Sequence, residues 1–317
     1  MKILIADKLD TDSLKNLKAE GFQLIETRGL ALESLPAVAS EVTLLVVRST
    51  LVPAAVIAAL PDLKLIIRAG AGTDNIDMGA AASRGIQVAN CPGKNADAVA
   101  EMALGLLLAA DRNIVEGTLA LRQGQWKKGA LSQSRGLKGR TLGIIGMGAV
   151  GRALARKAQG LEMKIIAYSR SLSNDEAKAS GIELIADMMD LPKTADAISV
   201  HVSLTAETRG CLNSTFFNAM KKGSILVNTS RGEVVDRPAL MEAIRKQGIR
   251  VALDVFAGEP KGAEAPFEDQ ELAALIVGTP HLAASTEQAA EAVGAEVVRI
   301  ASVFRDTGIA PNSVKGK

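Results

Sequence analysis

The sequence predicts an α/β protein built from two doubly wound parallel-sheet domains. Short apolar runs that end in Gly, Asn, Asp or Ser alternate with segments of helical periodicity along nearly the whole chain, which is the pattern of strand–helix–strand units. The runs are continuous and rich in β-branched residues, as in strands that are buried on both faces. At 317 residues the chain is also long for a single core, which favours two domains. The expected strands are Ile3–Ala6, Leu24–Glu26, Leu44–Val47, Leu65–Ile67, Ile86–Ala89, Leu142–Ile145, Ile165–Tyr168, Ile198–Val202, Ile225–Val227, Val251–Val255 and Ile276–Val277.

Two long helical patterns interrupt this alternation. From Asn95 to about Gly124 the periodicity is helical throughout, and a polar stretch follows up to Gly139. A long helix between two α/β blocks indicates the crossover between domains. The second pattern, Glu287–Phe304, is amphipathic and no strand follows it. Because it could pack back on the first block, that domain is expected to be discontinuous.

Composition argues against several classes of partner. The net charge is +2 and no run of Lys or Arg forms a basic tail, so we expect no nucleic-acid binding. The most apolar stretch, Met102–Ala110, is far shorter than the roughly 20 residues of a membrane span. Cys91 and Cys211 suit neither a disulfide framework nor a zinc site, so we expect no metal and a reducing cytoplasm. The strand-like run Met1–Asp7 is not expected to be a signal peptide.

A glycine-rich turn points to a dinucleotide site. The strand Thr141–Ile145 leads directly into Gly146, Gly148 and Gly151, then into a helical segment and a second strand, Lys164–Tyr168. The first glycine permits a tight turn, the second lets backbone approach a pyrophosphate, and the third permits close helix–strand packing. Free N–H groups at the helix N-terminus favour the phosphates. In this strand–turn–helix context the pattern predicts a Rossmann domain.

The end of the second strand bears on the choice of cofactor. NAD-binding domains usually carry an acidic residue there, which accepts hydrogen bonds from the ribose 2′-OH. Here the strand continues as Tyr168, Ser169, Arg170 and Ser171. Without the acid, a 2′-phosphate is not repelled, and Arg170 can pair with it. This favours NADP over NAD. The alternative is that Arg170 is a solvated cation and NAD binds without an acidic clamp.

Only two histidines are available for acid–base chemistry. His201 lies in the expected strand Ile198–Val202, where a structural role is the better interpretation. His281 follows Pro280 in a loop beyond the carboxyl end of a strand. Ligands collect at such ends in open α/β sheets. A loop histidine is by itself more often surface than catalytic, so its neighbours decide its interpretation.

Two charged residues follow neighbouring expected strands. Arg231 comes after the run Ile225–Val227, where a guanidinium can hold a substrate carboxylate bidentately. Glu259 follows Val251–Val255 by a short turn, and a carboxylate beside His281 would favour its imidazolium form. Each alone could be a solvated charge. Three complementary groups after three successive strands favour an active site.

The segments around these three residues resemble the signatures of D-isomer-specific 2-hydroxyacid dehydrogenases. Further matching segments lie earlier in the chain, between residues 68 and 101, so the resemblance covers nearly the whole chain. Together the motifs are highly specific. They are Arg68–Asn75, Asn90–Asn95, Ala98–Glu101, Asn228–Asp236, Asp254–Pro260 and Pro280–Thr286.

The resemblance implies hydride transfer between a nicotinamide and a small 2-hydroxy or 2-keto acid. Arg231 would bind the substrate carboxylate, His281 would exchange a proton with the substrate oxygen, and Glu259 would orient and charge His281. Beyond the three glycines, the implied cofactor residues are Ala149, Val150, Ser169, Arg170, Val202, Thr229, Ser230 and Asp254. The implied substrate residues are Arg48, Ser49, Arg68, Gly70, Ala71, Asn95 and Lys128.

The resemblance also implies an organisation of domains and subunits. Residues 1–95 plus 286–317 would form a flavodoxin-like substrate domain, and residues 96–285 the Rossmann cofactor domain, with a cleft between them that closes on substrate. The helix Asn95–Gly124 would form the twofold interface of a homodimer. Trp126 and Lys128 would then reach the cleft of the partner subunit.

Within the family the substrate is left open. Arg48, Arg68 and Lys128 favour a phosphorylated substrate, as in the members that oxidise 3-phosphoglycerate for serine synthesis, here in a short form without a C-terminal regulatory domain. Ala71 and Val202 depart from the Thr that those members often carry. NADPH-dependent glyoxylate or hydroxypyruvate reductases are the alternative that Ser169 and Arg170 favour. A non-enzymatic alternative is a dinucleotide-sensing scaffold, like the co-repressors of this fold.

Overall fold

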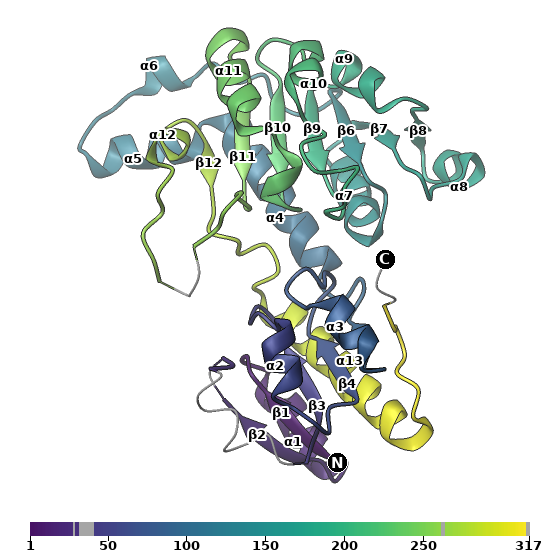
Figure 1. The fold of residues 1–317 in the computed structure, drawn as a ribbon. Helices are drawn as coiled ribbons and strands as arrows, with labels where there is room; N and C mark the ends of the chain where they lie inside the picture. Colours follow the sequence, from purple (N-terminus) through teal and green to yellow (C-terminus); the bar gives the residue numbers. More distant parts are fainter. Residues whose placement is uncertain (28, 32–40, 261–263, 315–317) are drawn as a thin grey trace. The chain divides into compact units, whose positions relative to one another are not determined.

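A computed structural model of the protein describes residues 1–27, 29–31, 41–260 and 264–314. They form two compact units, Met1–Asn95 with Ser285–Lys317, and Ala96–Ala284 (Figure 1). Each unit contains a parallel sheet with helices on both faces, which confirms the predicted fold class. All eleven expected strands form, with small differences at their ends. Residues 28, 32–40 and 315–317 of the predicted substrate domain lie outside the described residues.

The unit that contains the N-terminus has a five-stranded sheet in the order β2-β1-β3-β4-β5. Helices α1 and α13 cover one face of this sheet, where Val297, Ile300 and Phe304 of α13 pack with Ile3 and Leu44. Helices α2 and α3 cover the other face. The C-terminal helix therefore completes the core of the N-terminal strands. The elements are β1 Lys2–Ile5, α1 Thr11–Ala19, β2 Gln23–Glu26, β3 Val42–Val47, α2 Ala54–Ala58, β4 Leu65–Arg68, α3 Met78–Ser83, β5 Gln87–Asn90 and α13 Glu287–Thr307.

The unit Ala96–Ala284 has a seven-stranded sheet in the order β12-β11-β10-β9-β6-β7-β8. Helices α4 and α7 pack on one face, and α9, α10 and α11 on the other. The strand order reverses at β6, and ligands of open α/β sheets bind at the carboxyl ends of strands near such a point. The elements are α4 Ala96–Arg112, α5 Ile114–Arg122, α6 Lys128–Leu131, β6 Thr141–Ile145, α7 Ala149–Gly160, β7 Lys164–Tyr168, α8 Asn174–Ala179, β8 Ile182–Leu184, η2 Met188–Asp190, α9 Leu191–Thr194, β9 Ala197–Val200, α10 Ser214–Ala219, β10 Ile225–Asn228, η3 Gly232–Val234, α11 Arg237–Gln247, β11 Arg250–Leu253, α12 Gln270–Ala273 and β12 Val277–Gly278.

The structure corrects the expectation of one continuous helix from Asn95 to Gly124. Helix α4 ends at Arg112, and α5 starts again at Ile114. Between them Asn113 adopts a left-handed conformation with φ 53°, and its side-chain amide donates to the Leu131 carbonyl at 3.0 Å. Asn tolerates this conformation better than most residues.

Within the described residues, no helix is long and apolar enough to cross a membrane.

Candidate active site

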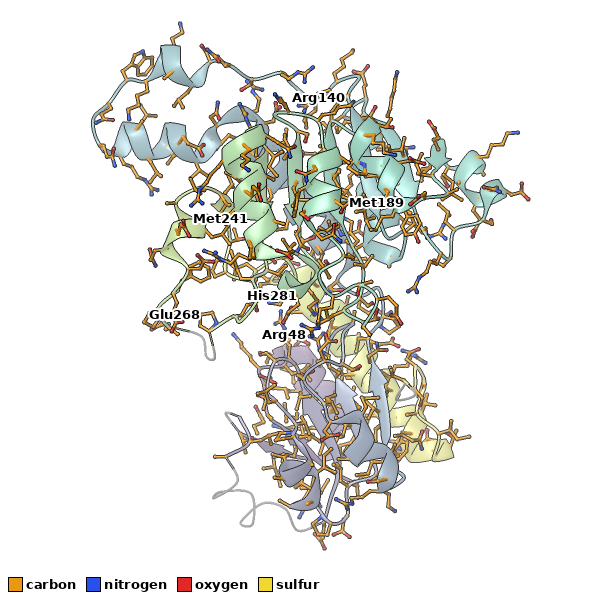
Figure 2. All side chains as sticks on the ribbon, turned by 45° about the horizontal axis from the view of Figure 1, so that its top comes forward. Arg48, Arg140, Met189, Met241, Glu268 and His281 are labelled. Atoms are coloured by element: carbon orange, nitrogen blue, oxygen red, sulfur yellow. The ribbon has the colours of Figure 1, made fainter. Side chains whose placement is uncertain are left out.

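Arg231, Glu259 and His281 follow β10, β11 and β12, which are neighbours in the seven-stranded sheet. His281 Nδ1 lies 2.7 Å from Glu259 Oε2. The second carboxylate oxygen, Oε1, accepts a hydrogen bond from the backbone N–H of Phe256 at 3.0 Å. In Figure 2, Arg140, which directly precedes β6, marks the edge of the sheet opposite to His281. The structure thus joins two predicted catalytic residues at the carboxyl edge of the sheet.

The charges around Glu259 keep it ionised. Its partial burial raises the pKa of the carboxyl group, but the hydrogen bonds from His281 and from the Phe256 N–H, together with the positive charges of His281 and Arg231, outweigh burial. The net result is a pKa below the usual value. A carboxylate that accepts from Nδ1–H leaves Nε2 of the imidazole available for proton exchange. The pair therefore has the composition of an oriented acid–base group.

Asn228 holds the loop that carries Arg231. This last residue of β10 is fully buried. Its side-chain amide donates to the Arg231 carbonyl at 2.8 Å, and its Oδ1 accepts from the backbone N–H and the hydroxyl of Ser230 at 2.9 and 2.8 Å. The hydroxyl of Thr229 is buried and has no hydrogen-bond partner among the described residues. An unpartnered buried hydroxyl fits the predicted contact of Thr229 with a cofactor.

Asp254 holds the loop that carries His281. Its carboxyl group is fully buried after β11 and accepts from the Thr279 hydroxyl at 2.6 Å and from the N–H groups of Leu282 and Ala283 at 2.7 and 2.9 Å. His281 itself has φ 53°, and its N–H donates to the Asp254 carbonyl at 2.8 Å. Positive φ in a residue other than glycine is uncommon and persists only where the surroundings enforce it. The predicted contact of Asp254 with the nicotinamide stays a prediction.

Gly232 is a site residue whose role the sequence did not reveal. A Cβ atom at this position would overlap the backbone of Phe256 and Ala257. Only glycine therefore allows the Arg231 loop to contact the turn that leads to Glu259. In the sequence, only its position after Arg231 singled it out. Its need to be glycine comes from contact with Phe256 and Ala257, which lie more than twenty residues away in the chain.

The three glycines after β6 differ in what surrounds them. Gly146 has φ 97°, and a Cβ there would lie 2.5 Å from the His201 carbonyl oxygen, whereas a Cβ on Gly151 would overlap the Gly146 carbonyl. Nothing lies within 4 Å of a Cβ placed on Gly148, which caps α7. The open side of Gly148, with Ala149 and Val150 in the first turn of α7, fits the approach of a pyrophosphate.

The end of β7 contains no carboxylate that could bind a ribose. Positions 168–171 are Tyr, Ser, Arg and Ser. The Ser169 hydroxyl accepts hydrogen bonds from the N–H groups of Ser171 and Leu172, each at 3.2 Å, so it shapes the turn itself. The Arg170 side chain is exposed. Val202 lies close to the glycine loop, because a Cβ on Gly146 would be 3.1 Å from its Cγ1.

His201 occupies a structural position, as its sequence context predicts. Strand β9 ends at Val200, so His201 lies just beyond the strand and not inside it. Its Nε2 lies 2.8 Å from the Ser199 hydroxyl, and burial lowers its pKa to about 4. The imidazole is therefore neutral at neutral pH. The backbone carbonyl of His201 faces Gly146 of the glycine loop.

The predicted substrate residues lie mostly in the other unit, and the structure describes their surroundings there. The backbone N–H groups of Arg48, Ser49 and Thr50 donate to Asp7 Oδ2 at 2.6, 3.2 and 3.0 Å. Asp7 was not predicted. A Cβ on Gly70 would overlap the guanidinium of Arg68, so the Arg68 side chain lies against this glycine.

The three remaining predicted substrate residues are Ala71, Asn95 and Lys128. The Ala71 carbonyl accepts from the side-chain amide of Asn90 at 2.6 Å. Asn95 is the last residue of the unit that contains the N-terminus. Lys128 belongs to the other unit, where it begins α6 and is exposed, two residues after a Trp126 that is 80% exposed.

A parallel sheet with this strand order, this glycine loop and this open approach defines a dinucleotide-binding α/β domain. The chain belongs to the D-isomer specific 2-hydroxyacid dehydrogenase family, because residues 104–304 match the model of that family's NAD binding domain. This confirms the resemblance inferred from the sequence, and it confirms the prediction of a nicotinamide dinucleotide as cofactor.

Individual relatives agree with the family but differ in their names. The chain is 40% identical to a D-3-phosphoglycerate dehydrogenase of Methanocaldococcus jannaschii over 96% of its length, although it spans only 58% of that protein. It is 39% identical to a hydroxypyruvate reductase of Thermotoga maritima, over 97% of the chain and 99% of the relative. Its fold is similar to the NADPH-dependent glyoxylate/hydroxypyruvate reductase of Sinorhizobium meliloti, solved with NADP and malonate, with a TM-score of 0.85, 28% identity and coverage of 99% and 96% of the two chains.

Proposed function

We propose that the protein is an NAD(P)-dependent dehydrogenase that interconverts a small D-2-hydroxy acid and the corresponding 2-keto acid. The observation that carries this proposal is the 2.7 Å pair between His281 Nδ1 and Glu259 Oε2, with Arg231 on the loop after the next strand. The family and the names of the relatives support it.

Each residue of this set has one role in the reaction. Hydride transfer is the chemistry that a nicotinamide would supply when bound. Arg231 holds the substrate carboxylate through its planar guanidinium. In the oxidation, His281 Nε2 takes the hydroxyl proton as the hydride leaves carbon, and in the reduction it returns that proton to the carbonyl oxygen. Glu259 accepts from Nδ1–H, so it fixes the tautomer and stabilises the imidazolium that forms.

For the substrate we propose 3-phosphoglycerate and 3-phosphohydroxypyruvate, which makes the protein a D-3-phosphoglycerate dehydrogenase of serine biosynthesis. Arg48, Arg68 and Lys128 support this, since charge-assisted hydrogen bonds suit a phosphate dianion. A second candidate is an NADPH-dependent hydroxypyruvate or glyoxylate reductase. The match over 99% of the Thermotoga maritima reductase and the residues Ser169 and Arg170 favour it.

Turnover with a panel of substrates tests the activity. We expect reduction of 3-phosphohydroxypyruvate, hydroxypyruvate, glyoxylate or pyruvate with NADH or NADPH. His281→Ala and Arg231→Ala should each lower kcat/KM more than about a hundredfold while dinucleotide binding survives. Near-normal turnover in either folded variant would contradict the assigned roles. A dinucleotide-sensing scaffold instead predicts negligible turnover of every substrate by the unmodified protein.

The phosphate contact can be tested separately. Arg48→Ala and Lys128→Ala should lower kcat/KM for 3-phosphohydroxypyruvate by roughly ten- to a hundredfold, because a charge-assisted hydrogen bond contributes about 1.5–3 kcal/mol. Hydroxypyruvate lacks the phosphate and serves as the matched control substrate. Equal losses on the two substrates would refute the phosphate site and favour the reductase.

The cofactor proposal is a preference for NADP over NAD. Its support is the absence of an acid at positions 168–171 and the exposed cation Arg170. Ser169→Asp combined with Arg170→Ala should shift the ratio of kcat/KM values towards NADH, because an acid repels the 2′-phosphate and accepts from the 2′-OH. A strong preference of the unmodified protein for NADH would contradict this proposal.

We also propose that the protein is a cytoplasmic homodimer. The apolar side chains of Ile114, Leu119 and Leu121 on α5 and of Trp126 after it are exposed, and several exposed apolar side chains in one short segment support an interface there. Light scattering should give twice the mass of the chain. Leu119→Lys should lower that mass towards the monomer, whereas a monomer before substitution would refute the proposal.

A further inference from the structure

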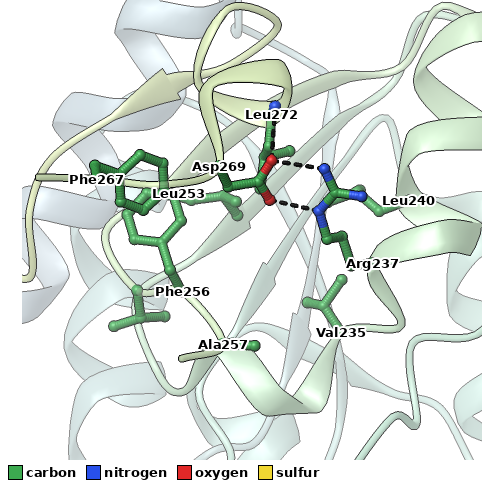
Figure 3. A pocket seen from close by; sticks show the side chains of 11 residues that line it. Val235, Arg237, Leu240, Leu253, Phe256, Ala257, Phe267, Asp269 and Leu272 are labelled. Atoms are coloured by element: carbon green, nitrogen blue, oxygen red, sulfur yellow. Dashed lines mark hydrogen bonds and ion pairs between the residues drawn. The ribbon is translucent and has the colours of Figure 1, made fainter. Parts of the chain in front are cut away.

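Further side chains contact the loops that carry Arg231 and Glu259. A cavity of about 50 Å³ is lined by Gly232, Phe256 and Ala257 and by Phe267, Asp269 and Leu272 (Figure 3). The first three residues belong to the loops after β10 and β11, which carry Arg231 and Glu259. Phe267 and Asp269 precede α12, and Leu272 lies within it. Because the cavity is small, the side chains that line it also contact one another.

Two aromatic rings close one side of this cavity. The ring centroids of Phe256 and Phe267 are 4.7 Å apart, and their planes make an angle of 64°. Such edge-to-face contacts are favourable beyond the apolar area they bury. Phe256 is also the residue whose backbone N–H donates to Glu259 Oε1 at 3.0 Å. The position of Phe256 therefore affects the carboxylate that contacts His281.

An ion pair anchors the segment that carries Phe267. Arg237 Nη2 lies 2.6 Å from Asp269 Oδ1, and Arg237 Nε donates to Oδ2, which makes the pair bidentate. Asp269 Oδ1 also accepts from the Leu272 N–H at 3.1 Å and so caps α12. Arg237 begins α11, directly after the loop of Arg231. Bidentate pairs between Arg and a carboxylate fix orientation as well as distance.

We propose that Phe267, anchored by the Arg237–Asp269 pair, is a positioning residue for Glu259. It holds Phe256, and through the backbone N–H of Phe256 it holds the carboxylate against Nδ1 of His281. The inference rests on the proposed function, since it assigns a role within the same site. Phe267 touches neither His281 nor any reacting atom in this scheme, so it acts only through Glu259.

The geometry predicts which kinetic constant changes. Glu259 is fixed at both oxygens, by Phe256 N–H at Oε1 and by His281 at Oε2. If Phe256 shifts, Oε1 loses its partner and the carboxylate can rotate away from the imidazole. The Arg231 carbonyl accepts from the side-chain amide of Asn228, and this anchor remains when Phe256 shifts, so binding of the substrate carboxylate should change less than proton transfer. Loss of Phe267 should therefore lower kcat with little change in KM.

A double-mutant cycle tests the proposal on hydroxypyruvate and the preferred nicotinamide. Phe267→Ala should lower kcat about five- to tenfold in the native background and much less in the Glu259→Gln background, because coupled residues are non-additive. Phe267→Leu, which refills the apolar contact, should restore most of the loss. An unchanged kcat in Phe267→Ala, or the same fold-loss in both backgrounds, would overturn the proposal.

Matched variants separate positioning from loss of fold. Asp269→Asn keeps an acceptor for the cap of α12 but weakens the ion pair, and it should reproduce part of the kcat loss if Phe267→Ala does not fold. Arg245→Ala removes an ion pair with Glu271 in the same surface network without touching Asp269, and kcat should not change. Full turnover of Glu259→Gln alone would refute the role of Glu259 and with it this inference, whereas no turnover by the unmodified protein would refute the proposed function.

Discussion

In each of the two units, one aspartate accepts hydrogen bonds from a loop that carries candidate site residues. The two aspartates, Asp254 and Asp7, differ in exposure. Asp254 follows β11 and accepts three hydrogen bonds from the loop after the neighbouring strand β12. Asp7 follows β1 and accepts from three successive N–H groups of the loop after the neighbouring strand β3. Asp254 is fully buried, whereas Asp7 is partly exposed.

The difference teaches that burial, more than the number of hydrogen bonds, decides how firmly such a loop is held. When Asp7 is removed, water can reach the N–H groups of Arg48, Ser49 and Thr50 and satisfy them. The Ala283 N–H that donates to Asp254 is buried, and an unpaired polar group there has no such substitute. Substitution of the two residues should therefore give unequal effects on stability.

The largest effect is expected for Asp254→Ala. The substitution leaves the Thr279 hydroxyl and the N–H groups of Leu282 and Ala283 without their acceptor, and it opens a cavity. We expect a loss of about 3–5 kcal/mol in the free energy of unfolding and a large loss of turnover, since the loop of His281 is no longer fixed. Urea denaturation and steady-state kinetics measure both. A loss below about 1 kcal/mol would show that the loop finds other hydrogen-bond partners and that burial of Asp254 does not decide how firmly the loop is held.

The same contrast explains which parts of the site the sequence predicts. Continuous β-branched runs identify strands such as β3 and β10, because burial on both faces acts on each residue along the strand. Arg231, Glu259 and His281 could be found because strand ends share one edge of the sheet. Chemistry-bearing side chains at that edge stand out from their apolar context.

The remaining features depend on contacts between distant segments. Nothing local marks Asp7 as the acceptor for a loop forty residues away, or Gly232 as the contact of Phe256. Strand β8 was missed because it has only three residues, of which Glu183 is polar. The break at Asn113 was missed because helical periodicity continues across it, while a bond to Leu131 stabilises the turn.

Acid should weaken one unit before the other, because His201, whose pKa is lowered by burial, lies in Ala96–Ala284. Burial holds the pKa of folded His201 at about 4, against 6.5 when unfolded. As pH falls through this window the unfolded chain binds a proton that the folded chain does not. Stability present above pH 6.5 is therefore lost, by about 2–3 kcal/mol, and His201 contributes no further loss below pH 4.

Hydrogen exchange of the two units between pH 6.5 and 5 measures this difference, since most carboxylates do not titrate there. As the pH falls, amide protection in strands β6 and β9 should decrease more than in β1 and β3. His201→Gln retains a side chain that can form a hydrogen bond with Ser199, and it should remove this additional pH dependence. Equal acid sensitivity of the two units would show that His201 is solvated in the folded protein.

The smallest effect is expected for Asp7→Ala. The three N–H groups of Arg48, Ser49 and Thr50 lose their acceptor but gain water, so the free energy of unfolding should fall by only about 1 kcal/mol. The loop itself should lose its fixed shape, because successive N–H groups converge only while one carboxylate accepts from all of them. We therefore expect KM for 3-phosphohydroxypyruvate to rise severalfold with little change in kcat. Asp7→Asn keeps one acceptor oxygen, so its KM should lie between those of the unmodified protein and of Asp7→Ala. If Asp7→Ala destabilises the protein as much as Asp254→Ala, then the number of hydrogen bonds and not burial sets the effect, and the contrast between the two units fails.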